Sequence, residues 1–176
     1  TQRYTDEAIR FMKANQLKPF FVYLPHTMPH TRLGASKDFK GKSPRGLYGD
    51  VIEEIDHSTG RILDALSELG LEKNTYVLFT SDNGPWLIKN KGKIDGTLER
   101  DHGGSAGILR SGKVSTWEGG QRVPTIFWAP GRIRPNTTCN AMASTLDILP
   151  TFAALAGAQA PEDRDLDGED IRHLLA

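Results

Sequence analysis

VLFTSDNG, residues 77–84, is a short apolar run that ends abruptly in an acid, an amide and a glycine. A continuous run of aliphatic and aromatic residues of this length is typical of a buried β-strand. We therefore expect a strand over residues 76–80, with Asp82 and Asn83 directly after its carboxyl end. In sheets covered by helices, ligands gather beyond the carboxyl ends of the strands, so this stretch predicts both a fold class and a site.

The same alternation extends outward from this strand. The predicted strands span residues 20–24, 76–80 and 124–129, and the predicted helices span residues 5–15, 47–69, 145–156 and 169–175. Thr5, with acids after it, predicts the cap of the first helix, and Gly70 predicts the end of the second. The run at 20–24 has no polar residue, which is typical of a strand buried on both faces. The order predicts an α/β fold with a central, mostly parallel sheet flanked by helices.

Length and composition narrow the class of protein. The chain has 176 residues, the size of one ordinary domain, and 22 basic residues balance 22 acidic ones. Zero net charge argues against a nucleic-acid partner, and no run approaches the ~18 apolar residues of a membrane span. Cys139 is the single cysteine, so an internal disulfide is excluded.

Asp82 and Asn83 offer a carboxylate and an amide oxygen, which are ligands suited to Ca²⁺ or Mg²⁺. The same residues with the following Gly-Pro are also a strong turn sequence on their own. Two oxygens cannot fill a site that wants ~6–8 ligands, so a metal site needs further ligands from elsewhere.

Three cationic or titratable residues in loops are further candidates. His26 and His30 lie in a Pro-rich loop, where a histidine can bind an oxyanion, protonate a leaving group or simply be solvated. Lys113 can act as a point charge for a sulfate or phosphate oxygen, although most lysines are solvated surface residues. Arg122 is expected to be paired structurally rather than to act in catalysis.

Six short motifs in order resemble the formylglycine-dependent sulfatases of the alkaline phosphatase superfamily. They are FFVYL at 20–24, MPH at 28–30, RGLYGD at 45–50, FTSDNG at 79–84, GKVSTWEGG at 112–120 and LDILPT at 146–151. The likeness is greatest to the arylsulfatase and N-acetylgalactosamine-6-sulfatase branch, and it covers the chain from about residue 19 to residue 175. It implies an alkaline phosphatase-like fold and hydrolysis of a sulfate monoester.

The resemblance also implies roles for individual residues. Asp82 and Asn83 match two ligands of the family's calcium ion, for which Mg²⁺ is the alternative. Lys113 matches the lysine that contacts the substrate sulfate. His30 matches the histidine near the leaving-group oxygen and fits that position better than His26.

The sequence departs from the family pattern at the nucleophile. Formylglycine arises from the Cys or Ser of a Cys/Ser-x-Pro/Ala-x-Arg motif, but the residues after Cys139 lack its proline and arginine, and Ser43-Pro44-Arg45 is one residue too short. The family's early Asp-Asp pair is also absent. We therefore expect residues 1–176 to form a single, incomplete catalytic domain whose nucleophile lies upstream. Alone, the chain should be inactive and should expose an unpaired sheet edge prone to aggregation.

Two other functions stay open from the sequence. One is a phosphoester hydrolase of the same superfamily, and the other is a catalytically inert, truncated homologue. The expected partner is a sulfate ester, such as a sulfated sugar or an aryl sulfate, recognised by the loops at 31–44 and 86–110. Family habit implies an extracytoplasmic location in the periplasm, the lysosome or the exterior, with which the glycosylation sequon at 136–138 is compatible.

Overall fold

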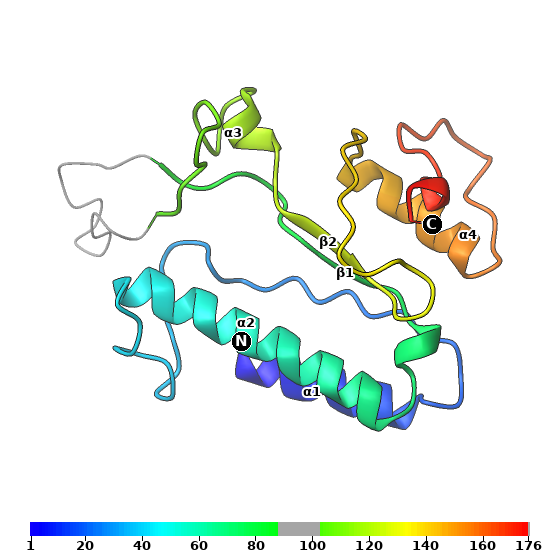
Figure 1. Cartoon of the computed structure of the whole chain (residues 1–176), viewed down its shortest axis with the longest axis horizontal. Helices are drawn as coiled ribbons and strands as arrows, with labels where there is room; N and C mark the ends of the chain where they lie inside the picture. The colour runs from blue at the N-terminus through cyan, green and yellow to red at the C-terminus, as the bar shows by residue number, and fades with distance from the viewer. Residues whose placement is uncertain (88–102, 176) are drawn as a thin grey trace. The chain divides into compact units, whose positions relative to one another are not determined.

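The computed structural model describes residues 1–87 and 103–175 (Figure 1). The chain divides into two compact units. Unit 1 comprises Thr1–Glu72 and Asn83–Pro124, and unit 2 comprises Lys73–Asp82 and Thr125–Ala176. Part of the long loop predicted between Asp82 and Glu118 lies outside the described residues.

Unit 1 is built around two packed helices, α1 (Gln2–Ala14) and α2 (Gly46–Glu68). Figure 1 shows α1 running alongside α2. The apolar residues buried on these two helices are Ala8, Met12, Val51, Ile55, Ala65 and Leu66. Full burial of an aliphatic side chain such as Leu66 stabilises the fold by about 1.5–3 kcal/mol. The amphipathic periodicity therefore predicts these helices well.

The second predicted helix is confirmed almost to its ends, and the first is confirmed with a wrong cap. Gly70 adopts φ +68°, and its N–H donates to the Ser67 carbonyl at 2.9 Å, which ends α2 as expected. Thr5 does not cap α1, because the helix begins at Gln2. Thr5 is fully buried, and its hydroxyl shares a hydrogen bond with the Ser58 hydroxyl on α2. Thr5 therefore lies at a helix–helix contact. Local sequence alone cannot distinguish a polar residue at such a contact from a helix cap.

The apolar run at residues 20–24 is not the buried strand that the sequence predicts. It lies outside every helix and strand, and Phe21 and Tyr23 are 66% and 78% exposed. An apolar run signals a tendency to be buried, whereas a strand also needs a neighbouring strand to pair with. The sheet of the described residues is formed by other segments.

Unit 2 contains the sheet, which is formed by β1 (Val77–Thr80) and β2 (Thr125–Trp128). The strands pair antiparallel, with Val77 opposite Trp128 and Thr80 opposite Thr125. The strands predicted over 76–80 and 124–129 are confirmed, but they pair antiparallel, so the described residues do not show the predicted mostly parallel sheet. Strand patterns in sequence report local burial, and they do not fix the direction in which two strands pair.

The remaining elements are short. They are η1 (Glu72–Asn74), α3 (Glu118–Gln121), η2 (Thr145–Asp147), α4 (Ile148–Leu155) and η3 (Arg172–Leu174). The η2–α4 pair confirms the helix predicted over 145–156, and η3 lies within the helical tail predicted over 169–175.

The Asp147 carboxylate joins the start of α4 to the tail of unit 2. Its oxygens accept the backbone N–H groups of Ser144 at 2.6 Å and Glu169 at 2.8 Å. Ser144 in turn accepts the Leu146 N–H at 3.1 Å, which completes a capping box. One carboxylate thus caps the helical segment and holds a residue that follows 22 positions later.

Candidate active site

Asp82 and Asn83 lie where the sequence predicts them, directly after β1. Asp82 is exposed and ends the first segment of unit 2, whereas Asn83 is half-buried and begins the second segment of unit 1. The Asn83 amide nitrogen donates to the Gly84 carbonyl at 3.2 Å, so the chain that follows holds this side chain.

A glycine junction in unit 1 joins the residues after Asn83 to the Glu-Gly-Gly turn at residues 118–120. The Gly84 N–H donates to the Gly120 carbonyl at 2.9 Å. A Cβ on Gly84 would lie 1.9 Å from the Gly119 carbonyl oxygen, and a Cβ on Gly119 would lie 2.1 Å from the Ser111 carbonyl oxygen. Only glycine permits so close an approach of two backbones. These glycines are therefore structural requirements of the site.

Lys113 is attached to the same junction. Its backbone N–H donates to the Pro85 carbonyl at 2.9 Å, which places the Lys113 backbone beside a residue two positions after Asn83. The Lys113 side chain is half-buried, and its ammonium makes no hydrogen bond or ion pair with the residues that the structure describes. The structure thus brings the predicted sulfate-binding lysine and one predicted metal ligand into one connected loop system.

His30 is exposed in the loop between α1 and α2. Its Nδ1 lies 2.6 Å from the Thr31 carbonyl oxygen. A carbonyl can only accept, so Nδ1 carries the proton and Nε2 is the nitrogen left to face a ligand. No hydrogen bond among the described residues links His30 to Lys113 or to Asp82.

His26, the other candidate histidine, is half-buried, and its Nδ1 has no hydrogen-bond partner among the described residues. Burial lowers the pKa of His26, and the positive charge of the Thr1 amino terminus lowers it further. A neutral imidazole cannot protonate a leaving group. The lowered pKa therefore disfavours His26 as a proton donor, and the role of His30 stays a prediction.

The α2 carboxylates hold the loop after His30, a role that the sequence did not reveal. Asp50 is 2% exposed, and its oxygens accept the N–H groups of Gly41 at 2.7 Å, Lys42 at 3.0 Å and Ser43 at 2.8 Å. The hydrogen bonds from Ser43 and Gly41 hold the pKa of Asp50 below its usual value. Glu54, one turn later, accepts the Ser36 N–H at 2.8 Å. The available signal in the sequence was the position of these two acids on the same helix face as Val51 and Ile55.

Two more residues that the sequence missed stand at either end of the Lys113 loop. The Arg110 guanidinium lies 3.6 Å from the centroid of the Trp117 ring, within the range of a cation–π interaction. Arg122, in contrast, pairs with Glu118 at 3.7 Å, as expected of a structural arginine. Both partners of that pair are largely exposed, so it adds little stability.

Asp82 and Asn83, the predicted metal ligands, carry oxygen donors of the kind that a hard cation prefers. The Asp82 carboxylate makes no hydrogen bond with any described residue, so its oxygens are available, and oxygen donors suit Ca²⁺ or Mg²⁺. Within residues 1–87 and 103–175, no group of three or more His, Cys, Asp or Glu side chains could hold a metal. Cys139 is free and exposed.

Comparison with known proteins places this chain in a family. Residues 1–158 match the Sulfatase family. Human steryl-sulfatase is 46% identical over 177 residues, which cover 99% of this chain and 29% of that protein. The chain belongs to the sulfatase family.

Other sulfatases agree with this assignment. Mouse N-acetylgalactosamine-6-sulfatase is 42% identical over 173 residues, which cover 97% of this chain and 32% of that protein. The crystal structure of the PsFucS1 sulfatase from Pseudoalteromonas sp. matches with a TM-score of 0.87 at 31% identity, over 99% of this chain and 34% of that one. The chain therefore spans about a third of the length of the sulfatases that it matches.

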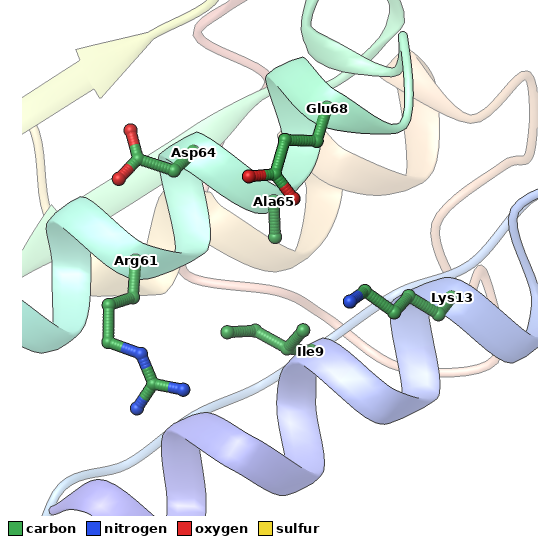
Figure 2. A pocket seen from close by; sticks show the side chains of 6 residues that line it. All are labelled: Ile9, Lys13, Arg61, Asp64, Ala65 and Glu68. Carbon is green, nitrogen blue, oxygen red and sulfur yellow. The ribbon is translucent and has the colours of Figure 1, made fainter.

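A hollow of about 250 Å³ in this sulfatase chain lies between α1 and α2 (Figure 2). Its lining residues are Ile9, Lys13, Arg61, Asp64, Ala65 and Glu68. Two cations and two anions balance one another there, and Arg61 is already paired with Asp6 at 2.7 Å. None of the predicted site residues lines the hollow.

No helix in the described part of the chain is long and apolar enough to cross a membrane.

Proposed function

We propose that this chain is a later part of a sulfatase catalytic domain and that it supplies cation, sulfate and leaving-group contacts for hydrolysis of a sulfate monoester. The observation that carries the proposal is the junction of Lys113 with the segment after Asn83. The Lys113 N–H bonds to Pro85, and the Gly84 N–H bonds to Gly120. Because the chain belongs to the sulfatase family, we assign this junction to the binding of a sulfate ester.

Lys113 acts as the point charge for a sulfuryl oxygen. Its ammonium makes no hydrogen bond or ion pair with another described side chain, and it is half-buried, which strengthens its attraction for an anion. Negative charge moves within the sulfuryl group as the ester bond breaks, and a cation held at those oxygens stabilises that change.

Asp82 and Asn83 provide two of the ligands of a calcium ion, or of Mg²⁺ in its place. The ion, when bound, neutralises charge on the sulfuryl group. Further ligands are needed from elsewhere, because two oxygens are far fewer than the ~6–8 that Ca²⁺ takes.

His30 protonates the oxygen of the departing alcohol. Because Nδ1–H is engaged with the Thr31 carbonyl, the proton for the leaving group comes from Nε2 of the imidazolium form. The same hydrogen bond holds the ring in one orientation, which a proton donor to a fixed substrate requires.

The nucleophile comes from an upstream segment in which a Cys or Ser has been converted to formylglycine, whose hydrated aldehyde supplies the attacking oxygen. Cys139 lacks the surrounding motif. The isolated chain is therefore inactive under this proposal.

The substrate is a sulfate ester of a sugar or of an aryl or sterol alcohol, and the protein acts in an extracytoplasmic compartment. The two relatives named above differ in their substrates by name, one steryl and the other N-acetylgalactosamine-6-sulfate. Specificity resides in the loops at 31–44 and 86–110, of which residues 88–102 lie outside the described part of the chain.

The test is hydrolysis of 4-methylumbelliferyl sulfate, with Ca²⁺ present, by the complete protein that contains this sequence. Lys113→Ala should lower kcat/KM by about 100- to 1,000-fold, the loss typical of one lost electrostatic contact to a transition state. Lys18→Ala, at an exposed position after α1, is the matched control and should retain full activity. Full activity in Lys113→Ala would contradict the proposal. So would hydrolysis of 4-methylumbelliferyl phosphate with no hydrolysis of the sulfate.

A further inference from the structure

The loop that carries Lys113 is closed at its base by contacts on both sides of the lysine. The Gly119 N–H donates to the Arg110 carbonyl at 2.9 Å, so residues 110 and 119 are joined across the loop. The Arg110 guanidinium lies 3.6 Å from the Trp117 ring centroid, so the side chains of the same two segments are also in contact. Nothing in the sulfatase chemistry described above uses Arg110 or Trp117.

Inside the loop the backbone has little freedom to rearrange. Ser111 and Val114 both adopt positive φ, at 64° and 69°. The Ser115 hydroxyl donates to the Gly112 carbonyl at 2.8 Å, and a Cβ on Gly112 would lie 2.5 Å from the Pro85 carbonyl oxygen. A non-glycine residue at positive φ persists only where surrounding contacts hold it there. The lysine is thus carried on a backbone whose conformation depends on the contacts at its base.

We infer that Arg110 is a positioning residue for Lys113, and that it acts by stacking on Trp117 and holding the base of the loop closed. This inference rests on the proposed function, since it gives Arg110 its effect through a sulfate-binding Lys113. Arg110 itself is exposed, and its charge lies on the indole face, where it is held by the ring rather than directed at a substrate. Loosening the loop leaves Lys113 chemically intact but less often in place.

The distinguishing experiment is a double-mutant cycle in the complete protein, assayed with 4-methylumbelliferyl sulfate. Arg110→Ala should lower kcat/KM about tenfold when Lys113 is present, because small displacements of a contacting group are costly. In a Lys113→Ala background the same change should cost less than about twofold, since residues that act as one unit are not additive. Equal losses in both backgrounds would overturn the inference, because Arg110 would then act without Lys113.

Conservative variants separate stacking from charge. Trp117→Phe keeps an aromatic face and should retain activity within about threefold, whereas Trp117→Ala should match the loss of Arg110→Ala. Full activity of Trp117→Ala would overturn the role of the stack. The thermal midpoint of each variant is measured alongside, and a loss of activity that tracks a general loss of folded protein would also overturn the assignment.

A readout independent of sulfate hydrolysis separates this inference from the proposed function. Amide hydrogen exchange over residues 110–120 of the complete protein should be faster in Arg110→Ala and Trp117→Ala, with the Gly119 amide most affected. Unchanged exchange would overturn the positioning role even if the protein is a sulfatase. Faster exchange in a protein that hydrolyses no sulfate ester would support the closed loop while contradicting the proposed function.

Discussion

Two loops of unit 1, the one after His30 and the one that carries Lys113, are held in place by different chemistry. Residues 41–43 donate their N–H groups to the buried carboxylate of Asp50. The loop at 110–120 is held by backbone contacts so close that Gly84 and Gly119 have no room for a Cβ, which would lie 1.9 Å and 2.1 Å from backbone oxygens. The loop after His30 depends on the charge of Asp50, so its stability should depend on pH. The Lys113 loop depends on glycines that leave room for the neighbouring backbone, so it should be sensitive to added side-chain volume.

The largest effect is expected from added volume in the Lys113 loop. Gly119→Ala would place a methyl group 2.1 Å from the Ser111 carbonyl oxygen and 2.5 Å from that of Arg110, so the backbone must move. We expect a loss of about 3 kcal/mol or more in the free energy of unfolding. Denaturant unfolding of the complete protein measures it.

Gly60→Ala is the matched control for that substitution. Gly60 lies within α2, and a Cβ there would have no atom within 4 Å apart from its chain neighbours and the backbone of its own helix. Alanine there should raise stability by roughly 0.5–1 kcal/mol through its better helix propensity. A similar loss in both variants would show that the close backbone contacts do not set the cost.

A smaller effect is expected when the charged anchor of the other loop is removed. Asp50→Ala leaves the N–H groups of residues 41–43 without their acceptor, and the loss of hydrogen bonds to a charged group is destabilising. The thermal midpoint should fall by less than for Gly119→Ala. Asp56→Ala, at an exposed position on the same helix, should leave it unchanged. If the two aspartate variants behave alike, Asp50 does not hold the loop.

Acid should distinguish the two loops within one protein. The hydrogen bonds from Ser43 and Gly41 lower the pKa of Asp50 in the folded state below its ordinary 3.8. The stabilisation is therefore complete above about pH 4–5 and is lost as the pH falls through the lowered folded pKa. Amide hydrogen exchange at residues 41–43, corrected for intrinsic rates, should therefore accelerate as the pH falls below about 4. Exchange at residues 110–120 should not accelerate over the same pH values. Equal acceleration in both loops, or the same profile in Asp50→Asn, would contradict this difference.

The smallest effect is expected from a change that relaxes the Lys113 loop without adding volume. Val114 is 78% exposed at φ 69°, a conformation unfavourable for a β-branched residue. Val114→Gly removes that strain at the cost of a more flexible unfolded chain, so stability should rise by about 0.5–1 kcal/mol. Chemical denaturation would detect it, and a loss of similar size would contradict the strain.

The elements that local sequence determines were predicted well. The spacing of apolar residues located α2 almost to its ends, and apolar runs located β1 and β2. The Asp-Asn pair after β1 and the lysine of the Gly-Lys motif were recognised as site candidates from their chemistry and from the family resemblance. Their roles stay predictions.

The features that depend on distant contacts were not predicted. The run at 20–24 carries the same local signal as β1 but forms no strand, and the antiparallel pairing of β1 with β2 leaves no trace in either strand alone. The junction of Gly84 with Gly120 joins residues 36 positions apart. The glycines of the turn at 118–122 indicate a close backbone approach, but the sequence does not say which segment approaches. Asp50 lies in the RGLYGD motif at residues 45–50, but the role of a buried acid can be assigned only when the N–H groups that donate to it are known.

The most direct test of the central claim compares two proteins in one assay: the complete protein that contains this sequence, and the isolated 176-residue chain. Release of 4-methylumbelliferone from its sulfate ester is followed for both, with and without Ca²⁺. We predict Ca²⁺-dependent hydrolysis by the complete protein and none by the isolated chain, because in the proposed function this chain supplies cation, sulfate and leaving-group contacts but no nucleophile. Hydrolysis by the isolated chain, or none by the complete protein, would contradict that account.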